Sequence, residues 1–211
     1  MSRQASAGEP VTYGLILAGG LARRMGGGDK ALIRVGDKTI LERTIATLGA
    51  QCAGLLINAN GDVSRFSRFG LPVVADDIAG FAGPLAGILA GLDWVAANAP
   101  KSEWVLSVPG DCPFLPRDLV ARLHAARIAS ELPLACAQSG EWRHPVVGLW
   151  AVALRHDLRR ALDGGTRKIE AWTRIHGAAP AQWPATPVDP FFNVNTPEDL
   201  AQAERIARRG A

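Results

Sequence analysis

The chain has 211 residues, of which 48% are hydrophobic and 20% are charged. This length and composition are sufficient for one α/β domain with a full core, and we expect a single domain over residues 1–211 in which residues 1–10 are flexible. The net charge of +3 comes from 23 basic and 20 acidic residues without a long basic block, which favours small anionic ligands over nucleic acid.

Cysteine usage and hydropathy exclude further classes of protein. Cys52, Cys112 and Cys136 show no C-x-x-C spacing, so neither a disulfide framework nor a cysteine zinc site is indicated. Residues 1–10 are polar and lack the apolar run of a signal peptide. The most apolar stretch, residues 81–92, is too short to span a bilayer and contains Pro84 and three glycines. We therefore expect a soluble, cytoplasmic protein.

Short runs rich in Val, Ile and Leu predict buried strands, and helical segments lie between them. The predicted strands are residues 11–17, 54–59, 72–75, 104–108 and 146–150, and the predicted helices are residues 40–48, 88–97, 117–129 and 196–208. Thr39 with Glu42 forms a capping box before the first helix, and Thr196, Pro197 and Asp199 signal the start of the last. Residues 61–69 and 178–190 are predicted as mobile loops, the second extended because it contains four prolines.

Alternation of strands and helices requires crossover connections and therefore predicts an α/β fold with a mostly parallel sheet between helical layers. Such sheets bind ligands at the carboxyl ends of their strands.

A glycine-rich loop with basic side chains directly follows the first predicted strand. Residues 17–30 read LAGGLARRMGGGDK and include five glycines. Without a Cβ, glycine allows consecutive backbone N–H groups to turn toward one anion, and a triphosphate needs many such donors. Arg24 can clamp phosphate oxygens with its planar fork, and Lys30 offers a compact charge for the α-phosphate.

Two common phosphate-binding loops do not match this segment. A Walker A loop requires Gly-Lys followed by Ser or Thr, whereas Lys30 follows Asp29 and precedes Ala31. The glycines also lack the G-x-G-x-x-G spacing of a dinucleotide fold. A switch GTPase of the P-loop type is therefore disfavoured.

The pattern L-A-G-G-x-x-x-R-M-G-x-x-D-K-x-L, from Leu17 to Leu32, resembles the signature loop of small nucleotidyltransferases with a glycosyltransferase-A-like fold. Further matches follow in the order of that family. They are Asn58 in Ile57-Asn58-Ala59-Asn60, Asp76, Gly83-Pro84-Leu85-Ala86-Gly87, Gly110-Asp111-Cys112-Pro113, His144-Pro145 and Asn193-Val194-Asn195-Thr196-Pro197. Together they extend over residues 13–207 and resemble the molybdenum cofactor guanylyltransferases in particular. The resemblance implies a three-layer, Rossmann-like fold with a mostly parallel sheet flanked by helices.

The resemblance also implies roles for individual residues. The implied catalytic residues are Lys30, Arg24 and Asp111, and Asp111 would bind Mg²⁺. The implied nucleotide- and substrate-binding residues are Leu17, Ala18, Gly19, Gly20, Lys30, Asn58, Asp76, Asp111, Asn193 and Asn195. Magnesium prefers oxygen ligands, and Asp111 follows a strand at its carboxyl end, although an aspartate in such a turn can also bond its own backbone. Strand-end capping remains an alternative for Asn58, as does a turn role for Asn193 and Asn195.

The activity implied by the resemblance is transfer of GMP from GTP to the terminal phosphate of molybdopterin, with release of pyrophosphate. Two other enzymes remain open from the residues, namely a cytidylyltransferase acting on the same pterin and a nucleotidyltransferase acting on a sugar or polyol phosphate. A protein that binds GTP or the pterin without catalysis is the alternative from another class. The implied partners are GTP, molybdopterin and transient cofactor-delivery or acceptor proteins, with neither nucleic acid nor a membrane.

Overall fold

The computed structural model describes residues 10–19, 28–78 and 83–209. Its centre is a seven-stranded sheet with the order β5-β4-β1-β6-β8-β7-β9. The strands are β1 (Thr12–Leu17), β4 (Gly54–Asn58), β5 (Val73–Val74), β6 (Trp104–Pro109), β7 (Leu134–Ser139), β8 (Trp142–Ala151) and β9 (Ala179–Trp183). All pairs are parallel except those of β8, which runs antiparallel to β6 and β7.

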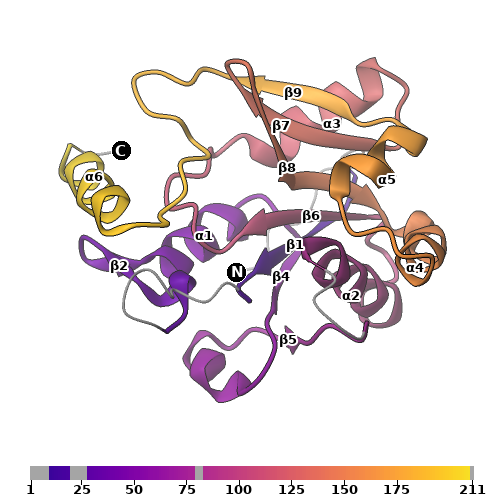
Figure 1. Cartoon of the computed structure of the whole chain (residues 1–211), viewed down its shortest axis with the longest axis horizontal. Coiled ribbons are helices and arrows are strands. Elements are labelled where there is room, and N and C mark those ends of the chain that lie inside the picture. Colours follow the sequence, from indigo (N-terminus) through magenta and orange to yellow (C-terminus); the bar gives the residue numbers. More distant parts are fainter. Residues whose placement is uncertain (1–9, 20–27, 79–82, 210–211) are drawn as a thin grey trace.

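Helices cover both faces of this sheet, which gives three layers (Figure 1). The helices are α1 (Ile40–Gly49), α2 (Pro84–Asn98), α3 (Leu119–Ala129), α4 (Arg155–Asp163), α5 (Ile169–His176) and α6 (Pro197–Arg208), with 3-10 turns η2 (Lys30–Leu32), η3 (Val63–Phe69) and η4 (Val152–Leu154). One face packs on α1, η3 and α3, and the other on α2, α4 and α5. Helix α6 packs instead on the small ribbon of β2 (Arg34–Val35) and β3 (Lys38–Thr39).

The central strands are mostly apolar, and both of their faces are buried. In β1, Leu15 contributes to the core under α2 while its neighbour Ile16 contributes to the core under α1, and both are fully buried. Successive side chains of a strand point to opposite faces, so a continuous apolar run fills two cores at once. This explains why runs of Val, Ile and Leu were sufficient to predict the central strands.

The predicted fold class is confirmed, as are all five predicted strands and all four predicted helices, with small shifts at their ends. The predicted capping box at Thr39 is present, and the predicted start signal at Thr196 also proves to be a capping box. Thr39 Oγ1 accepts a hydrogen bond from the backbone of Glu42 and Thr196 Oγ1 accepts one from Asp199. The predictions of mobile loops were wrong in part. Residues 63–69 form η3, whose Phe66 is fully buried, and residues 179–183 form β9.

Strands β7 and β8 form a hairpin whose turn consists of Gly140 and Glu141, and Gly140 has φ of 54°. A positive φ is readily adopted by glycine, which suits it to this tight reversal. Among the helices that the structure describes, none is both long and apolar enough to cross a membrane.

Candidate active site

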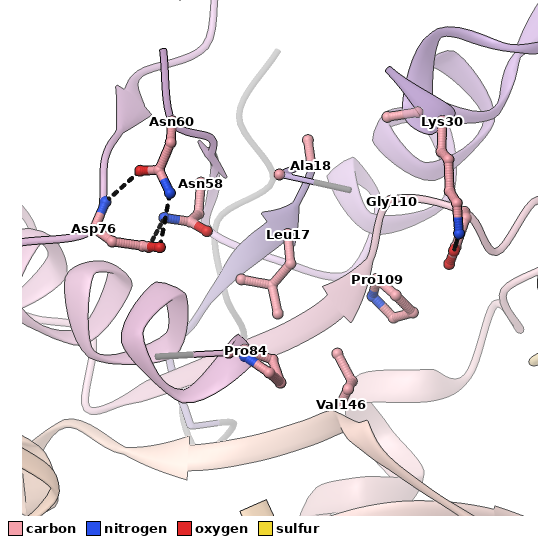
Figure 2. Close-up of a pocket in the computed structure, with 14 residues that line it drawn as sticks. Leu17, Ala18, Lys30, Asn58, Asn60, Asp76, Pro84, Pro109, Gly110 and Val146 are labelled. Carbon is pink, nitrogen blue, oxygen red and sulfur yellow. Dashed lines mark hydrogen bonds and ion pairs between the residues drawn. The ribbon is translucent and has the colours of Figure 1, made fainter. Parts of the chain in front are cut away.

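A cavity of about 510 Å³ opens at the carboxyl ends of β1, β4 and β6. Leu17 and Ala18, at the end of β1, lie between two polar ends of the cavity (Figure 2), and Gly19 also lines it. Asn58, Asn60 and Asp76 lie at one end, and Lys30 lies at the other. The predicted location of the site at this edge of a parallel sheet follows from the shared direction of the strands.

The first polar end is a closed network of two amides and one carboxylate. Asn58 Nδ2 donates to Asp76 Oδ1 at 2.8 Å, and Asn60 Nδ2 donates to Asp76 Oδ2 at 2.9 Å. Asn60 Oδ1 in turn accepts from the backbone N–H of Asp76 at 2.9 Å. Both carboxylate oxygens of Asp76 are thereby fixed in orientation, and each retains a lone pair for a donor in the cavity.

Helix α2 makes room for this network at Gly87. A Cβ at Gly87 would lie 2.3 Å from Asn58 Oδ1 and 2.8 Å from Leu17 Cδ2, so only glycine allows the Asn58 side chain to occupy its position. The structure shows that Gly87 accommodates a protein side chain.

The second polar end brings together residues that are far apart in the sequence. Lys30 Nζ lies 3.3 Å from Asp111 Oδ2 and also donates a hydrogen bond to Asn195 Oδ1. Lys30 begins η2, Asp111 follows β6, and Asn195 precedes α6. The exposed fractions of the Lys30 and Asp111 side chains are 21% and 15%, so the pair is partly shielded from water.

Burial raises the pKa of Asp111, and the adjacent ammonium of Lys30 opposes that shift. Among the described residues, Asp111 Oδ1 is buried without a hydrogen-bond partner. An unpartnered oxygen on a buried carboxylate is costly unless something binds it, because burial removes its water. This oxygen is therefore a candidate metal ligand.

The turn that carries Asp111 is packed closely on the end of β1. Gly110 N donates to Leu17 O at 2.9 Å, and a Cβ at Gly110 would lie 3.0 Å from that same oxygen. On its other side, Asp111 O accepts from Val194 N at 2.9 Å, and Cys112 Sγ lies 2.9 Å from Asn193 Oδ1. The segment containing Asn193 and Asn195 is thus held directly against the Asp111 turn.

Comparison with known proteins places these residues in a family. The model of the MobA-like NTP transferase domain matches residues 14–179. A molybdenum cofactor guanylyltransferase from Nitrobacter hamburgensis is 60% identical over 199 residues, which cover 94% of this chain and 95% of that protein.

This chain belongs to the molybdenum cofactor guanylyltransferase family.

Solved structures agree with this assignment at the level of the fold. Molybdopterin-guanine dinucleotide biosynthesis protein A from Archaeoglobus fulgidus superposes with a TM-score of 0.73 at 20% identity, covering 93% of this chain and 99% of that one. A Mycobacterium tuberculosis protein, solved in complex with manganese, has a TM-score of 0.66 at 17% identity and covers 93% and 98%. As a member of the guanylyltransferase family, the chain is a nucleotidyltransferase.

Most residues singled out from the motifs of the guanylyltransferase family lie around this cavity. Its lining includes Leu17, Ala18, Gly19, Lys30, Asn58, Asp76 and Asp111. Asn193 and Asn195 are not part of the lining but contact Cys112 and Lys30 beside it. Gly20 and Arg24 lie outside the described residues, as do residues 1–9.

His144, from the His-Pro motif of the family, is not among the residues that line the cavity and belongs instead to a hydrogen-bonded trio with Ser139 and Asp189. Its Nε2 lies 2.7 Å from Ser139 Oγ, and Ser139 Oγ donates to Asp189 Oδ2 at 2.8 Å. Burial lowers the pKa of His144, with the Asp189 carboxylate opposing the shift. Ser139 is fully buried, so this trio anchors residue 189 to the β7–β8 hairpin.

Proposed function

We propose that this protein transfers GMP from GTP to the terminal phosphate of molybdopterin with the help of Mg²⁺ and releases pyrophosphate. The observation that carries the proposal is the juxtaposition of Lys30 and Asp111 at one end of the cavity, opposite the Asn58–Asp76 network at the other. The family relationship supplies the class of substrate. A cavity with a cation and a free carboxylate oxygen at one end and oriented polar groups at the other suits a nucleoside triphosphate.

The nucleoside belongs at the amide and carboxylate end. Guanine presents its N1–H and its exocyclic amine as neighbouring donors, and a carboxylate whose orientation is fixed can accept from both. Asp76 is such a carboxylate, since Asn58 and Asn60 hold its two oxygens. Cytosine lacks the N1–H donor of guanine, so this end favours GTP over CTP.

The triphosphate belongs at the Lys30 end. An oxygen of the acceptor phosphate attacks the α-phosphorus in line, the bond from that phosphorus to the bridging oxygen breaks, and pyrophosphate leaves with the electron pair. No protein nucleophile is needed, because the acceptor is already ionised. The obstacle is repulsion between two anions, which at ~4 Å and an effective dielectric near ~20 amounts to about 4 kcal/mol, nearly a thousandfold in rate. Lys30 offsets this repulsion.

The residues present fit a divalent cation whose remaining ligands come from the substrate. No three His, Cys, Asp or Glu side chains cluster as a metal site in the described parts of the chain, so an all-protein cage is not available there. Mg²⁺ commonly binds one or two carboxylates and takes its other ligands from phosphate and water. Asp111, with its unpartnered Oδ1, would hold it, and when bound it would neutralise charge on the departing pyrophosphate. A Mycobacterium tuberculosis protein with this fold was solved in complex with manganese, so a divalent metal is compatible with the fold.

Asn193 and Asn195 are proposed to face the acceptor phosphate. Asn195 already contacts Lys30, and Asn193 is exposed beside the Asp111 turn. Amide N–H groups can donate to a phosphate without adding charge. Arg24 is proposed as a second phosphate-binding cation.

The test is incubation of the purified protein with molybdopterin, Mg²⁺ and each of the four ribonucleoside triphosphates in turn, with pyrophosphate release as the readout. Release with GTP alone, together with guanine retained in the pterin product, supports the proposal. Release with CTP instead identifies a cytidylyltransferase. Saturable GTP binding without pyrophosphate in any mixture identifies a binding protein and overturns the proposal, as does turnover that requires a sugar or polyol phosphate.

A further inference from the structure

Arg65 lies outside the cavity but contacts segments that lead to both of its polar ends. Its Nε is 2.7 Å from Asp29 Oδ2, and its NH2 donates to Asn60 O at 2.8 Å. A third contact runs from its NH1 to Asp62 O. The Nε–Asp29 contact is an ion pair without hydrogen-bond geometry, whereas NH1 and NH2 donate hydrogen bonds to backbone carbonyls. One guanidinium therefore contacts two segments that belong to opposite ends of the site.

The contact with Asp29 bears on the phosphate end. Asp29 immediately precedes Lys30 and occupies the N-cap position of η2, but its side chain makes no capping hydrogen bond within the described structure. Its carboxylate pairs with Arg65 instead, and its side chain is only 10% exposed. The position of the Lys30 backbone is thus tied to Arg65.

The contact with Asn60 bears on the nucleoside end. Asn60 makes two hydrogen bonds to Asp76, one through each atom of its amide. Because Arg65 binds the backbone carbonyl of Asn60, displacement of Arg65 would release the residue that orients the Asp76 carboxylate. One side chain therefore connects Asp29 and Lys30 to Asn60 and Asp76.

A neighbouring arginine provides a built-in comparison. Residues 64–69 repeat the tripeptide Ser-Arg-Phe, so Arg65 and Arg68 have the same local sequence on η3. Arg65 is 24% exposed and lies over the ring of the fully buried Phe66. Arg68 is 56% exposed, and its ion pair with Glu42 Oε1 is loose, with an N–O distance of 3.7 Å. A partly buried guanidinium that combines an ion pair with hydrogen bonds to two backbone carbonyls fixes geometry better than a loose surface pair.

We propose that Arg65 is a positioning residue that sets the spacing between the Lys30 end and the Asp76 end of the nucleotide site. The inference rests on the proposed function for the identity of the ligand. When the two ends of a site are already held at the correct spacing, a ligand that spans the site can bind without the cost of first ordering the protein. Loss of Arg65 then weakens binding of GTP while the protein remains folded.

The experiment measures GTP binding in the presence of Mg²⁺ by calorimetry for wild type, Arg65→Ala, Asp29→Ala, the double variant and the control Arg68→Ala. We expect Arg65→Ala and Asp29→Ala each to raise Kd by about tenfold, with a stoichiometry near that of wild type. Because the two residues act through one contact, the double variant should be no worse than the more affected single variant. Arg65→Lys, which keeps the charge but not the fork of donors, should recover part of the loss.

Two results would overturn the inference. One is a Kd for Arg65→Ala that equals that of Arg68→Ala, and the other is a double variant whose loss is the product of the two single losses. A lower stoichiometry with unchanged Kd also counts against it, since that pattern reports misfolded protein. Failure of the proposed function has a separate signature, namely wild-type protein that binds GTP and releases no pyrophosphate when molybdopterin is added.

Discussion

Lys30 Nζ lies 3.3 Å from Asp111 Oδ2, although the two residues are 81 positions apart in the chain. The contact joins the end of the glycine-rich segment to the turn after β6. A cation and a carboxylate with one oxygen still free are therefore present side by side before any ligand arrives. Under the proposed function, this arrangement would be preorganised for the charge that develops during nucleotidyl transfer.

Replacing Lys30 by Ala should lower kcat by ~100-fold or more, as expected for the loss of one group that stabilises transition-state charge. Single-turnover measurements of pyrophosphate release would show the effect on the chemical step. Lys38→Ala is a matched control, because Lys38 is an exposed lysine on β3. Equal single-turnover rates for the Lys30 variant and wild type would refute the assignment.

Replacing Asp111 by Ala or Asn should abolish metal-dependent turnover and leave unfolding cooperative. Burial already raises the pKa of this carboxyl group, so the ionised form adds little to the stability of the fold. Titration of activity with Mg²⁺ and a thermal melt separate the two effects. Asp37→Asn is the control, since the Asp37 side chain is 80% exposed and pairs loosely with Arg43 at 3.7 Å. Activity that saturates normally with Mg²⁺ in the Asp111 variants would rule out the metal role.

Two glycines one turn apart on α2 should respond differently to a methyl group. In Gly87→Ala the added Cβ would meet the Asn58 amide, so we expect kcat/KM for GTP to fall about tenfold with little loss of stability. In Gly91→Ala the Cβ would lie 2.6 Å from Leu15 in the core, which should cost roughly 1–3 kcal/mol of stability and leave KM unchanged. Both variants gain the same helix propensity, so the comparison isolates the clash. Identical kinetic and thermal profiles for the two would contradict this reading.

His124 should make the protein less stable as the pH falls below neutrality. Burial, followed by the charge of Arg127, lowers the pKa of His124 from 6.5 to about 4. Its Nδ1 accepts from Arg127 Nε at 3.0 Å and its Nε2 lies 2.7 Å from Thr12 Oγ1, an arrangement that requires the neutral ring. The unfolded chain takes up this proton near pH 6.5 and the folded chain only near pH 4, so stability is complete above pH 6.5 and declines toward pH 4.

The expected loss over that interval is about 2–3 kcal/mol, from roughly 1.4 kcal/mol for each unit of pKa shift. Denaturant unfolding of wild type and His124→Gln at several pH values measures it, and the difference between the two proteins isolates this residue. The exposed His156, changed to Gln, serves as the control. A His124→Gln curve parallel to that of wild type would contradict the assignment.

Sequence patterns were sufficient for the central strands and for the edge strand β5, but not for β7 and β9 on the opposite side of the sheet. Strands β1, β4 and β6 are buried on both faces and consist mostly of apolar residues. Strand β9 reads APAQW and contains Pro180, which is tolerated because β9 lies at the edge of the sheet and, within the described part of the chain, pairs with β7 alone. Helix α4 reads RHDLRRALD and buries only Leu158 and Leu162, so its apolar pattern was too sparse to detect.

The residues of the candidate site also fall into those that the sequence could place and those that it could not. Lys30, Asn58, Asp76 and Asp111 could be placed at one edge because each follows or ends a recognisable element, and parallel strands bring such ends together. Arg65 could not, because the sequence around it is the same as that around Arg68. What distinguishes the two arginines is the packing of η3, which places Arg65 beside Asp29 and leaves Arg68 at the surface.

Because β8 runs antiparallel to β7, the two strands are joined by a short surface turn that can change in length. The hairpin turn at Gly140 and Glu141 lies on the carboxyl edge of β7, the edge at which the cavity also opens. Residues can be inserted into this turn without altering the register of β1, β4 or β6, which hold the proposed nucleotide end. This turn could therefore vary in length between related proteins while the strand ends that carry Asn58 and Asp111 keep their positions.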